Sequence, residues 1–97
     1  MNIRTGRQVV TTAGTAVALA TENTPVSKVI ICPETDNTNP VTVGDSEVVG
    51  ALATRRGIPL DTDATTHQLI EICDVDLKDV FIDSVTSGEG VTFTYFF

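Results

Sequence analysis

The chain is poor in the residues that most active sites use. It has one histidine, no tryptophan and two cysteines among 97 residues. A Ser-His-Asp or Cys-His site would depend on His67 alone, which alternates with Leu69 on an expected strand and is expected at a surface or interface position. No glycine-rich loop joins a strand to a helix, as a phosphate site requires. The sequence predicts no catalytic residue, no cofactor and no enzymatic activity.

Two cysteines are also too few for a disulfide framework. Cys32 and Cys73 each end an apolar run, where a free cysteine behaves as a small buried hydrophobe. We therefore expect free thiols. A disulfide between them is the alternative if their strands are neighbours.

Closely spaced acids at 61–63 and 74–76 raise the question of a calcium site, because hard cations need several oxygen ligands. The spacing of an EF-hand loop fails here. Thr66 stands where that loop needs glycine, and Ile72 where it needs a bidentate glutamate. Asx turns and solvated strand ends account for these acids, and no metal site is predicted.

The net charge of −7 is unevenly distributed. Residues 1–60 hold five acids and five bases, whereas residues 61–97 hold eight acids and only Lys78 as a base. An acidic surface repels phosphate, so no nucleic-acid partner is predicted. We interpret the excess charge as an aid to solubility, with docking to a basic partner as the alternative.

The first 20 residues resemble a secretory signal only superficially. Two arginines precede an alanine-rich stretch, but Thr11, Thr12, Gly14 and Thr15 interrupt it and it contains no leucine-rich block. No segment approaches transmembrane length. We expect a soluble protein made in a cytoplasm, with no membrane partner.

Composition and punctuation indicate an all-β fold. Val and Thr fill 29 positions, and both stiffen χ1 and pack well on a pleated surface. Regularly spaced Gly, Pro, Asn and Asp indicate about seven or eight short antiparallel strands in a β-sandwich or jelly roll. We expect an N-terminal arm and first strand in residues 1–12 and a single sandwich domain in 13–97. The expected strands are 8–12, 15–19, 26–32, 41–43, 58–60 (an edge segment), 67–73, 77–83 and 91–97. The expected turns are 22–25, 44–46, 61–65, 74–76 and a hairpin at 87–90, and 48–57 is expected to be a loop.

Alternation predicts which side chains share a face. In 77–83, Val80 and Ile82 share one face and Asp79, Phe81 and Asp83 the other. In 91–97, Val91, Phe93, Tyr95 and Phe97 share one face and Thr92, Thr94 and Phe96 the other. Phe81 and Phe96 thus point away from the expected core. They indicate a subunit contact, and burial under the alanine-rich N-terminal segment is the alternative.

The order of several short motifs resembles small virion structural proteins of tailed bacteriophages. The motifs are VTVGDSEV at 41–48, GIPL at 57–60, VDLKDVFID at 75–83 and GVTFTY at 90–95. The opening GTAVAL at 14–19 and the pair Thr24-Pro25 also fit, so the resemblance covers residues 13–97. In that family a Pro-Gly turn usually follows "G-x-P-L". Residues 61–65 replace it here, which leaves the role of this loop open.

The resemblance implies a β-sandwich present in many copies in a phage particle. Head decoration, or cement, is the first expectation: a homotrimer on the capsid surface that clamps the major capsid protein. A tail, collar or baseplate component is the second, and a receptor- or carbohydrate-binding module the third. From charge and position, we expect the arm at residues 1–8 to anchor on a neighbouring subunit. The candidate interface residues are Arg4, Arg7, Phe81, Phe96 and Phe97.

Overall fold

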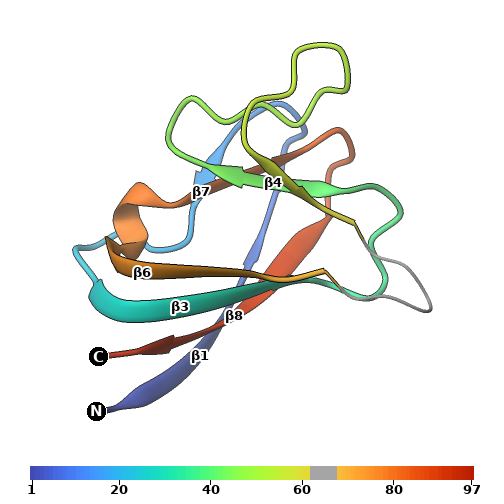
Figure 1. Ribbon diagram of the computed structural model, residues 1–97. Coiled ribbons are helices and arrows are strands. Elements are labelled where there is room, and N and C mark those ends of the chain that lie inside the picture. The colour runs from blue at the N-terminus through green and yellow to red at the C-terminus, as the bar shows by residue number, and fades with distance from the viewer. Residues whose placement is uncertain (62–67) are drawn as a thin grey trace.

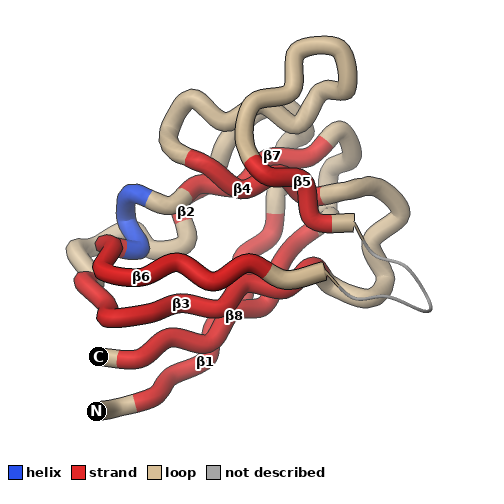
Figure 2. Tube along the Cα trace, viewed as in Figure 1, coloured by secondary structure: helices blue, strands red, loops and turns tan. Residues whose placement is uncertain are grey.

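The protein is a two-layer β-sandwich, as the composition predicts (Figure 1). A computed structural model describes residues 1–61 and 68–97. Its strands form two four-stranded antiparallel sheets, which face each other as separate layers in Figure 2. The long sheet has the order β1 (Ile3–Val9), β8 (Gly90–Phe96), β3 (Pro25–Pro33) and β6 (Ile70–Asp76). The short sheet has the order β2 (Val17–Ala18), β7 (Phe81–Ser84), β4 (Val41–Gly44) and β5 (Ile58–Leu60).

The order 1-8-3-6 against 2-7-4-5, antiparallel throughout, is that of an eight-stranded jelly roll. The core lies between the layers and follows the alternation of the central strands. Ile31 on β3 faces Phe93 on β8, and both side chains are buried. The core residues are Val10, Leu19, Val26, Val29, Ile31, Val41, Val43, Leu60, Leu77, Val80, Ile82, Val91 and Phe93.

Four of the eight expected strands are confirmed, and the strand expected at 67–73 is β6, which ends three residues later than expected. The strands expected at 26–32, 41–43 and 91–97 are β3, β4 and β8, and β5 at 58–60 is an edge strand as expected. The strand expected at 15–19 shrinks to β2. Residues 48–57 are a loop, tied by one bridge between Val49 and Arg56. His67 and residues 62–65 lie outside the described residues.

The hairpin expected at 87–90 is wrong. β7 lies in the short sheet and β8 in the long sheet, so this turn carries the chain across the sandwich. The local reversal itself exists, because Gly88 adopts a left-handed φ of 93°. Its N–H, however, donates to the Val10 carbonyl at 2.8 Å and not to a paired strand. Turn chemistry marks where a chain reverses, but not which strand it then joins.

The turn expected at 74–76 is also wrong, because β6 continues to Asp76. The chain turns one step later, in a single 3₁₀ turn, η1 (Leu77–Asp79), which buries Leu77. Asp76 caps this turn by accepting the Lys78 N–H. The expected strand 77–83 is accordingly reduced to β7, and Asp83, expected on the outer face, is buried.

The N-terminal segment is part of the long sheet. The strand expected at 8–12 lies earlier, at Ile3–Val9, and it pairs with β8 along its whole length. Residues 3–9 are therefore a strand of the sandwich and not a separate arm; that this segment anchors on a neighbouring subunit stays a prediction. Few apolar residues mark this segment, and it becomes a strand because β8 offers it a partner.

Candidate interaction surface

The two ends of the chain lie side by side at one end of the sandwich (Figure 1). Asn2 and Phe97 exchange backbone hydrogen bonds of 2.6 and 3.0 Å. The next pair in the register is Ile3 and Phe96. This pairing places the aromatic end of β8 beside the first residues of β1.

Phe93 and Tyr95 of β8 and the following Phe97 form a ladder of aromatic rings on the inner face of the long sheet. The ring centroids of Phe93 and Tyr95 are 6.0 Å apart, and those of Tyr95 and Phe97 are 5.8 Å apart. Phe93 is buried, but the ladder runs outward until Phe97 is 42% exposed. The Arg4 guanidinium lies 5.5 Å from the Phe97 ring centroid, within range of a cation–π contact. Together with Asn23, Thr24 and Pro25, these outer residues line a hollow of about 280 Å³.

The outer face of the same end is also apolar. Phe96 is half-buried there, with the Lys28 ammonium 5.9 Å from its ring centroid. Met1 and Ile3 are 95% and 62% exposed. We define the terminal patch as Met1, Ile3, Arg4, Phe96 and Phe97. These residues lie at one end of the long sheet, with Arg4 and Phe97 on its inner face and Met1, Ile3 and Phe96 on its outer face. Exposed apolar side chains at such an end are typical of a protein contact.

The structure brings together three of the five predicted interface residues: Arg4, Phe96 and Phe97. Arg7 lies farther along β1, where its Nε bonds to Glu34 Oε2 at 3.0 Å. Phe81 lies on β7 in the other sheet, opposite Ala18 and Gly44, and is half-buried.

Sequence reasoning missed Met1 and Ile3. The only feature of the sequence that could have indicated these two residues is their position near Arg4 and Arg7, in the segment 1–8 that was expected to anchor on a neighbouring subunit.

The thiols are free, as expected. Cys32 on β3 is half-buried, whereas Cys73 on β6 is exposed. Their strands are neighbours, but the register places Cys73 opposite Lys28, four residues along β3 from Cys32. That offset is too long for a disulfide.

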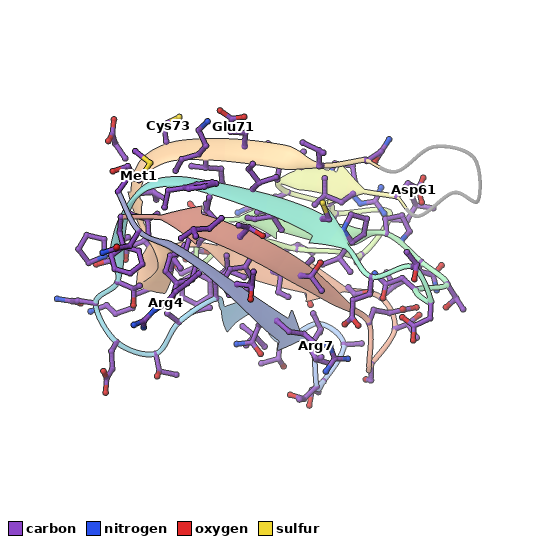
Figure 3. The ribbon with its side chains drawn as sticks, turned by 90° about the horizontal axis from the view of Figure 1, so that it is seen from below. Met1, Arg4, Arg7, Asp61, Glu71 and Cys73 are labelled. Atoms are coloured by element: carbon purple, nitrogen blue, oxygen red, sulfur yellow. The ribbon has the colours of Figure 1, made fainter. Side chains whose placement is uncertain are left out.

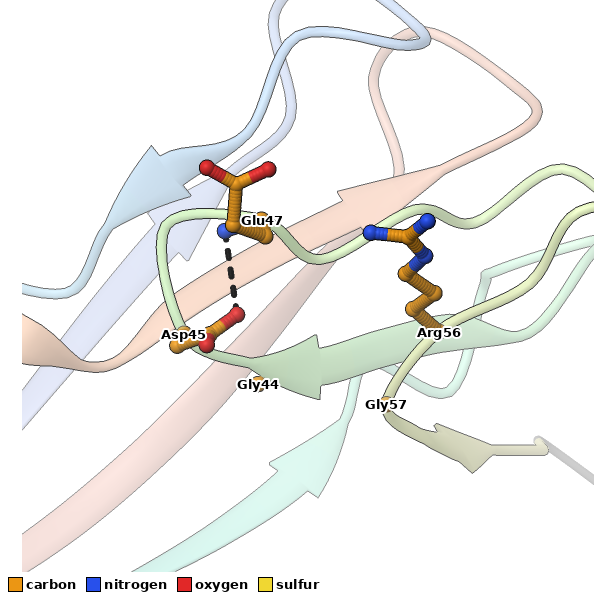
Figure 4. A pocket seen from close by; sticks show the side chains of 5 residues that line it. All are labelled: Gly44, Asp45, Glu47, Arg56 and Gly57. Atoms are coloured by element: carbon orange, nitrogen blue, oxygen red, sulfur yellow. Dashed lines mark hydrogen bonds between the residues drawn. The ribbon is translucent and has the colours of Figure 1, made fainter.

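A second hollow, of about 540 Å³, lies where β4 meets the 45–57 loop (Figure 4). Asp45 Oδ1 accepts the Glu47 N–H at 3.0 Å, and Arg56 lines the same hollow. The lining holds charges of both signs but no histidine, cysteine or serine. Across the described parts of the chain, no three His, Cys, Asp or Glu side chains are grouped to bind a metal ion.

Residues 1–61 and 68–97 include no helix long and apolar enough to cross a bilayer. No family model matches this chain, and neither does any curated protein or solved structure. The terminal patch is thus the candidate site that the geometry provides.

Proposed function

We propose that the protein is a non-enzymatic structural subunit of a tailed-bacteriophage particle, with capsid decoration as its first role. The observation that carries the proposal is the terminal patch, which exposes apolar side chains where the chain ends meet. The motif series at 41–48, 57–60, 75–83 and 90–95 supplies the link to virion proteins. The jelly roll, a fold common in viral capsids, supports it by analogy only.

The mechanism follows from the chemistry of the patch. Burying Met1, Ile3, Phe96 and Phe97 against a neighbour contributes about 25 cal/mol for each Å² of apolar surface removed from water. One such contact is modest, but symmetry repeats it at every copy in a particle. The expected partners are further copies of this chain, as a homotrimer, and the major capsid protein. A net charge of −7 disfavours a nucleic-acid partner.

The first test is quantitative mass spectrometry of purified virions, with this protein scaled against the major capsid protein. A ratio near that of an abundant capsid component supports decoration. A few copies per particle would favour a tail, collar or baseplate component over capsid decoration. Absence from the virion would contradict the proposal. Binding in a glycan screen would instead favour the receptor or carbohydrate module.

A second test removes one ring of the patch. Phe97→Ala is expected to weaken association with particles by about tenfold, because a truncated aromatic anchor typically costs more than about 1 kcal/mol. Phe81→Ala is the matched control, since that phenylalanine lies in the other sheet. Equal binding of wild-type protein and Phe97→Ala to particles would show that Phe97 is not part of the contact and would contradict the role of the terminal patch.

A further inference from the structure

We infer that the two edges of the long sheet pair with each other between copies, β1 of one copy beside β6 of the next. This inference rests on the proposed assembly role and names the partner as a second copy of this chain. In the described residues, β1 and β6 each have a neighbour on one side only. Figure 3 shows Arg4 and Arg7 along one margin of the sheet and Glu71 and Cys73 along the opposite margin.

The directions and lengths of the two edges fit this pairing. Every pair in the long sheet is antiparallel, so in a four-stranded sheet β1 and β6 run in opposite directions. Copies in the same orientation therefore form one continuous antiparallel sheet. Each edge strand is seven residues long. The contact is head-to-tail, and such contacts close into a ring when the rotation between copies allows it.

The backbone groups that point outward identify the residues that pair. Asn2 and Val10 bond to residues 97 and 89 across β8. Antiparallel alternation therefore turns the N–H and C=O groups of Thr5 and Arg7 outward. Directly after β3, the Glu34 N–H donates to the Gly90 carbonyl. The even-numbered residues of β3 therefore bond to β8, and the odd-numbered residues Val29 and Ile31 bond to Ile72 and Ile70 of β6. The same rule turns Glu71 and Cys73 outward.

Charge selects one register between these edges. β1 carries Arg4 and Arg7 and no acid, whereas β6 carries the exposed Glu71 and Asp74, the half-buried Asp76 and no base. Placing Arg7 opposite Glu71 forms one pair of opposite charges within the ladder, and it brings Arg4 beside Asp74 just beyond the last regularly paired residue, Cys73. Opposite charges in cross-strand pairs stabilise a sheet. A shift of two residues in either direction loses the Arg7–Glu71 pair. One such shift would place Arg4 opposite Asp76, but that carboxylate already accepts the N–H groups of Thr24 and Lys78. Pairing β1 with β1 would join two edges of the same positive charge.

The neighbours of these charges agree with the same register. Arg7 is paired with Glu34 but is 61% exposed, and Glu71 lies 3.4 Å from Lys28 but is 49% exposed. A contact between them would join the two ion pairs into a row of four alternating charges. Val9 then falls opposite Leu69, which is 57% exposed. The Val9 N–H is already bonded to Gln8 Oε1 at 3.0 Å, so the backbone ladder ends there.

The other end of the ladder is set by Asp74. Its φ of 52° leaves the strand conformation, so regular pairing stops at Cys73, opposite Thr5. Residues in a hydrogen-bonded antiparallel pair have Cα atoms about 5.5 Å apart, which a disulfide can bridge. The inference therefore predicts a specific covalent link between copies.

The test is Thr5→Cys in a Cys32→Ser background, oxidised with glutathione disulfide and run on a non-reducing gel. We expect covalent oligomers that disappear when Cys73→Ser is added. Ile3→Cys is the matched control, because it lies on the same exposed edge but two residues, or about 7 Å, out of register. Equal cross-linking from Ile3→Cys, or cross-links that persist with Cys73→Ser, would overturn the register.

Two further measurements separate this inference from the function proposed above. Arg7→Gln is expected to weaken self-association by up to about fivefold, as for one exposed ion pair. Thr5→Pro should abolish self-association with the fold intact, because its N–H points away from β8. A wild-type protein that is monomeric by sedimentation equilibrium, yet abundant in virions, would contradict edge pairing and leave the virion role standing. An oligomer that cross-links as expected but is absent from virions would support edge pairing and contradict the virion role.

Discussion

The two sheets of the sandwich are held together in different ways. Strands of the long sheet have seven to nine residues and are joined mainly by backbone ladders. Strands of the short sheet have two to four residues and are flanked by long loops. Short ladders contribute few backbone hydrogen bonds. Buried N–H groups of the loops therefore need side-chain acceptors.

Two buried carboxylates provide that fastening. Asp83 on β7 is 1% exposed and accepts the N–H groups of Gly14 at 3.0 Å and Gly50 at 2.8 Å. Glu89 is 5% exposed, and its Oε1 accepts from the Thr38 N–H, the Thr38 hydroxyl and the Asn39 N–H. Two of the eight acids in the acidic third of the chain are thus internal ties.

The largest effect is expected from a methyl group at Gly50. A Cβ there would lie 2.9 Å from the backbone N and Cα of Ser84, which cannot move aside alone. Gly50→Ala should displace the loop and break its bond to Asp83, lowering the free energy of unfolding by about 2–4 kcal/mol.

Urea unfolding of Gly50→Ala and of Gly6→Ala would measure how much free energy of unfolding each sheet loses when a methyl group is added. At Gly6 in the long sheet, the added Cβ meets the end of the Phe93 ring at 2.5 Å. A ring edge gives way more readily than backbone, so we expect a smaller loss, of about 1–2 kcal/mol. A larger loss at Gly6 would show that the long sheet is the less tolerant layer.

The next effect is expected from Asp83→Ala, which leaves the buried Gly50 N–H without its acceptor. An unsatisfied buried donor costs roughly 1–3 kcal/mol. Asp83→Asn keeps one acceptor oxygen and should lose less. Hydrogen exchange should show the 50–53 backbone opening in Asp83→Ala while β3 stays protected. Uniform loss of protection in both sheets would mean that the layers unfold as one unit.

The smallest effect is a pH dependence at the junction of β6 and η1. The N–H groups of Thr24 and Lys78 donate to Asp76 and hold the pKa of its carboxyl below the ordinary value of 3.8. Desolvation opposes this lowering of the pKa, and the positive charge of Lys78 adds to it. Because the folded pKa is depressed, the stabilisation is complete above the unfolded value and is lost as pH falls through the folded one. Stability of wild type relative to Asp76→Asn should therefore shrink as pH falls from about 5 toward 2. Asp79→Asn, an exposed carboxyl of the same turn, is the control, and equal acid profiles for the two variants would contradict the role of Asp76.

Sequence reasoning predicted the elements whose pattern is set by local burial. β8 alternates clearly, and Val91, Phe93 and Tyr95 on its inner face pack in the core as expected. β1 was misplaced because its strand depends on pairing with β8 more than on its own residues. The buried position of Asp83 was missed for a similar reason, since the N–H groups it accepts come from loops 33 and 69 residues away in the chain.

The candidate site was also predicted in part. Arg4, Phe96 and Phe97 were identified from charge and aromatic content. Their gathering with Met1 and Ile3 required knowing that the two chain ends pair. Phe81 carries the same signal in sequence as Phe96, and only the division into two sheets separates them.

The meeting of residues 1 and 97 also has a practical consequence for engineering. A fusion tag joined at either position would emerge from the terminal patch and crowd any partner docked there. The tip of the 48–57 loop, where Leu52 is 80% exposed, lies well away from both ends (Figure 1). A peptide inserted at this tip would leave the patch clear, and on an assembled ring or particle it would be displayed once per subunit.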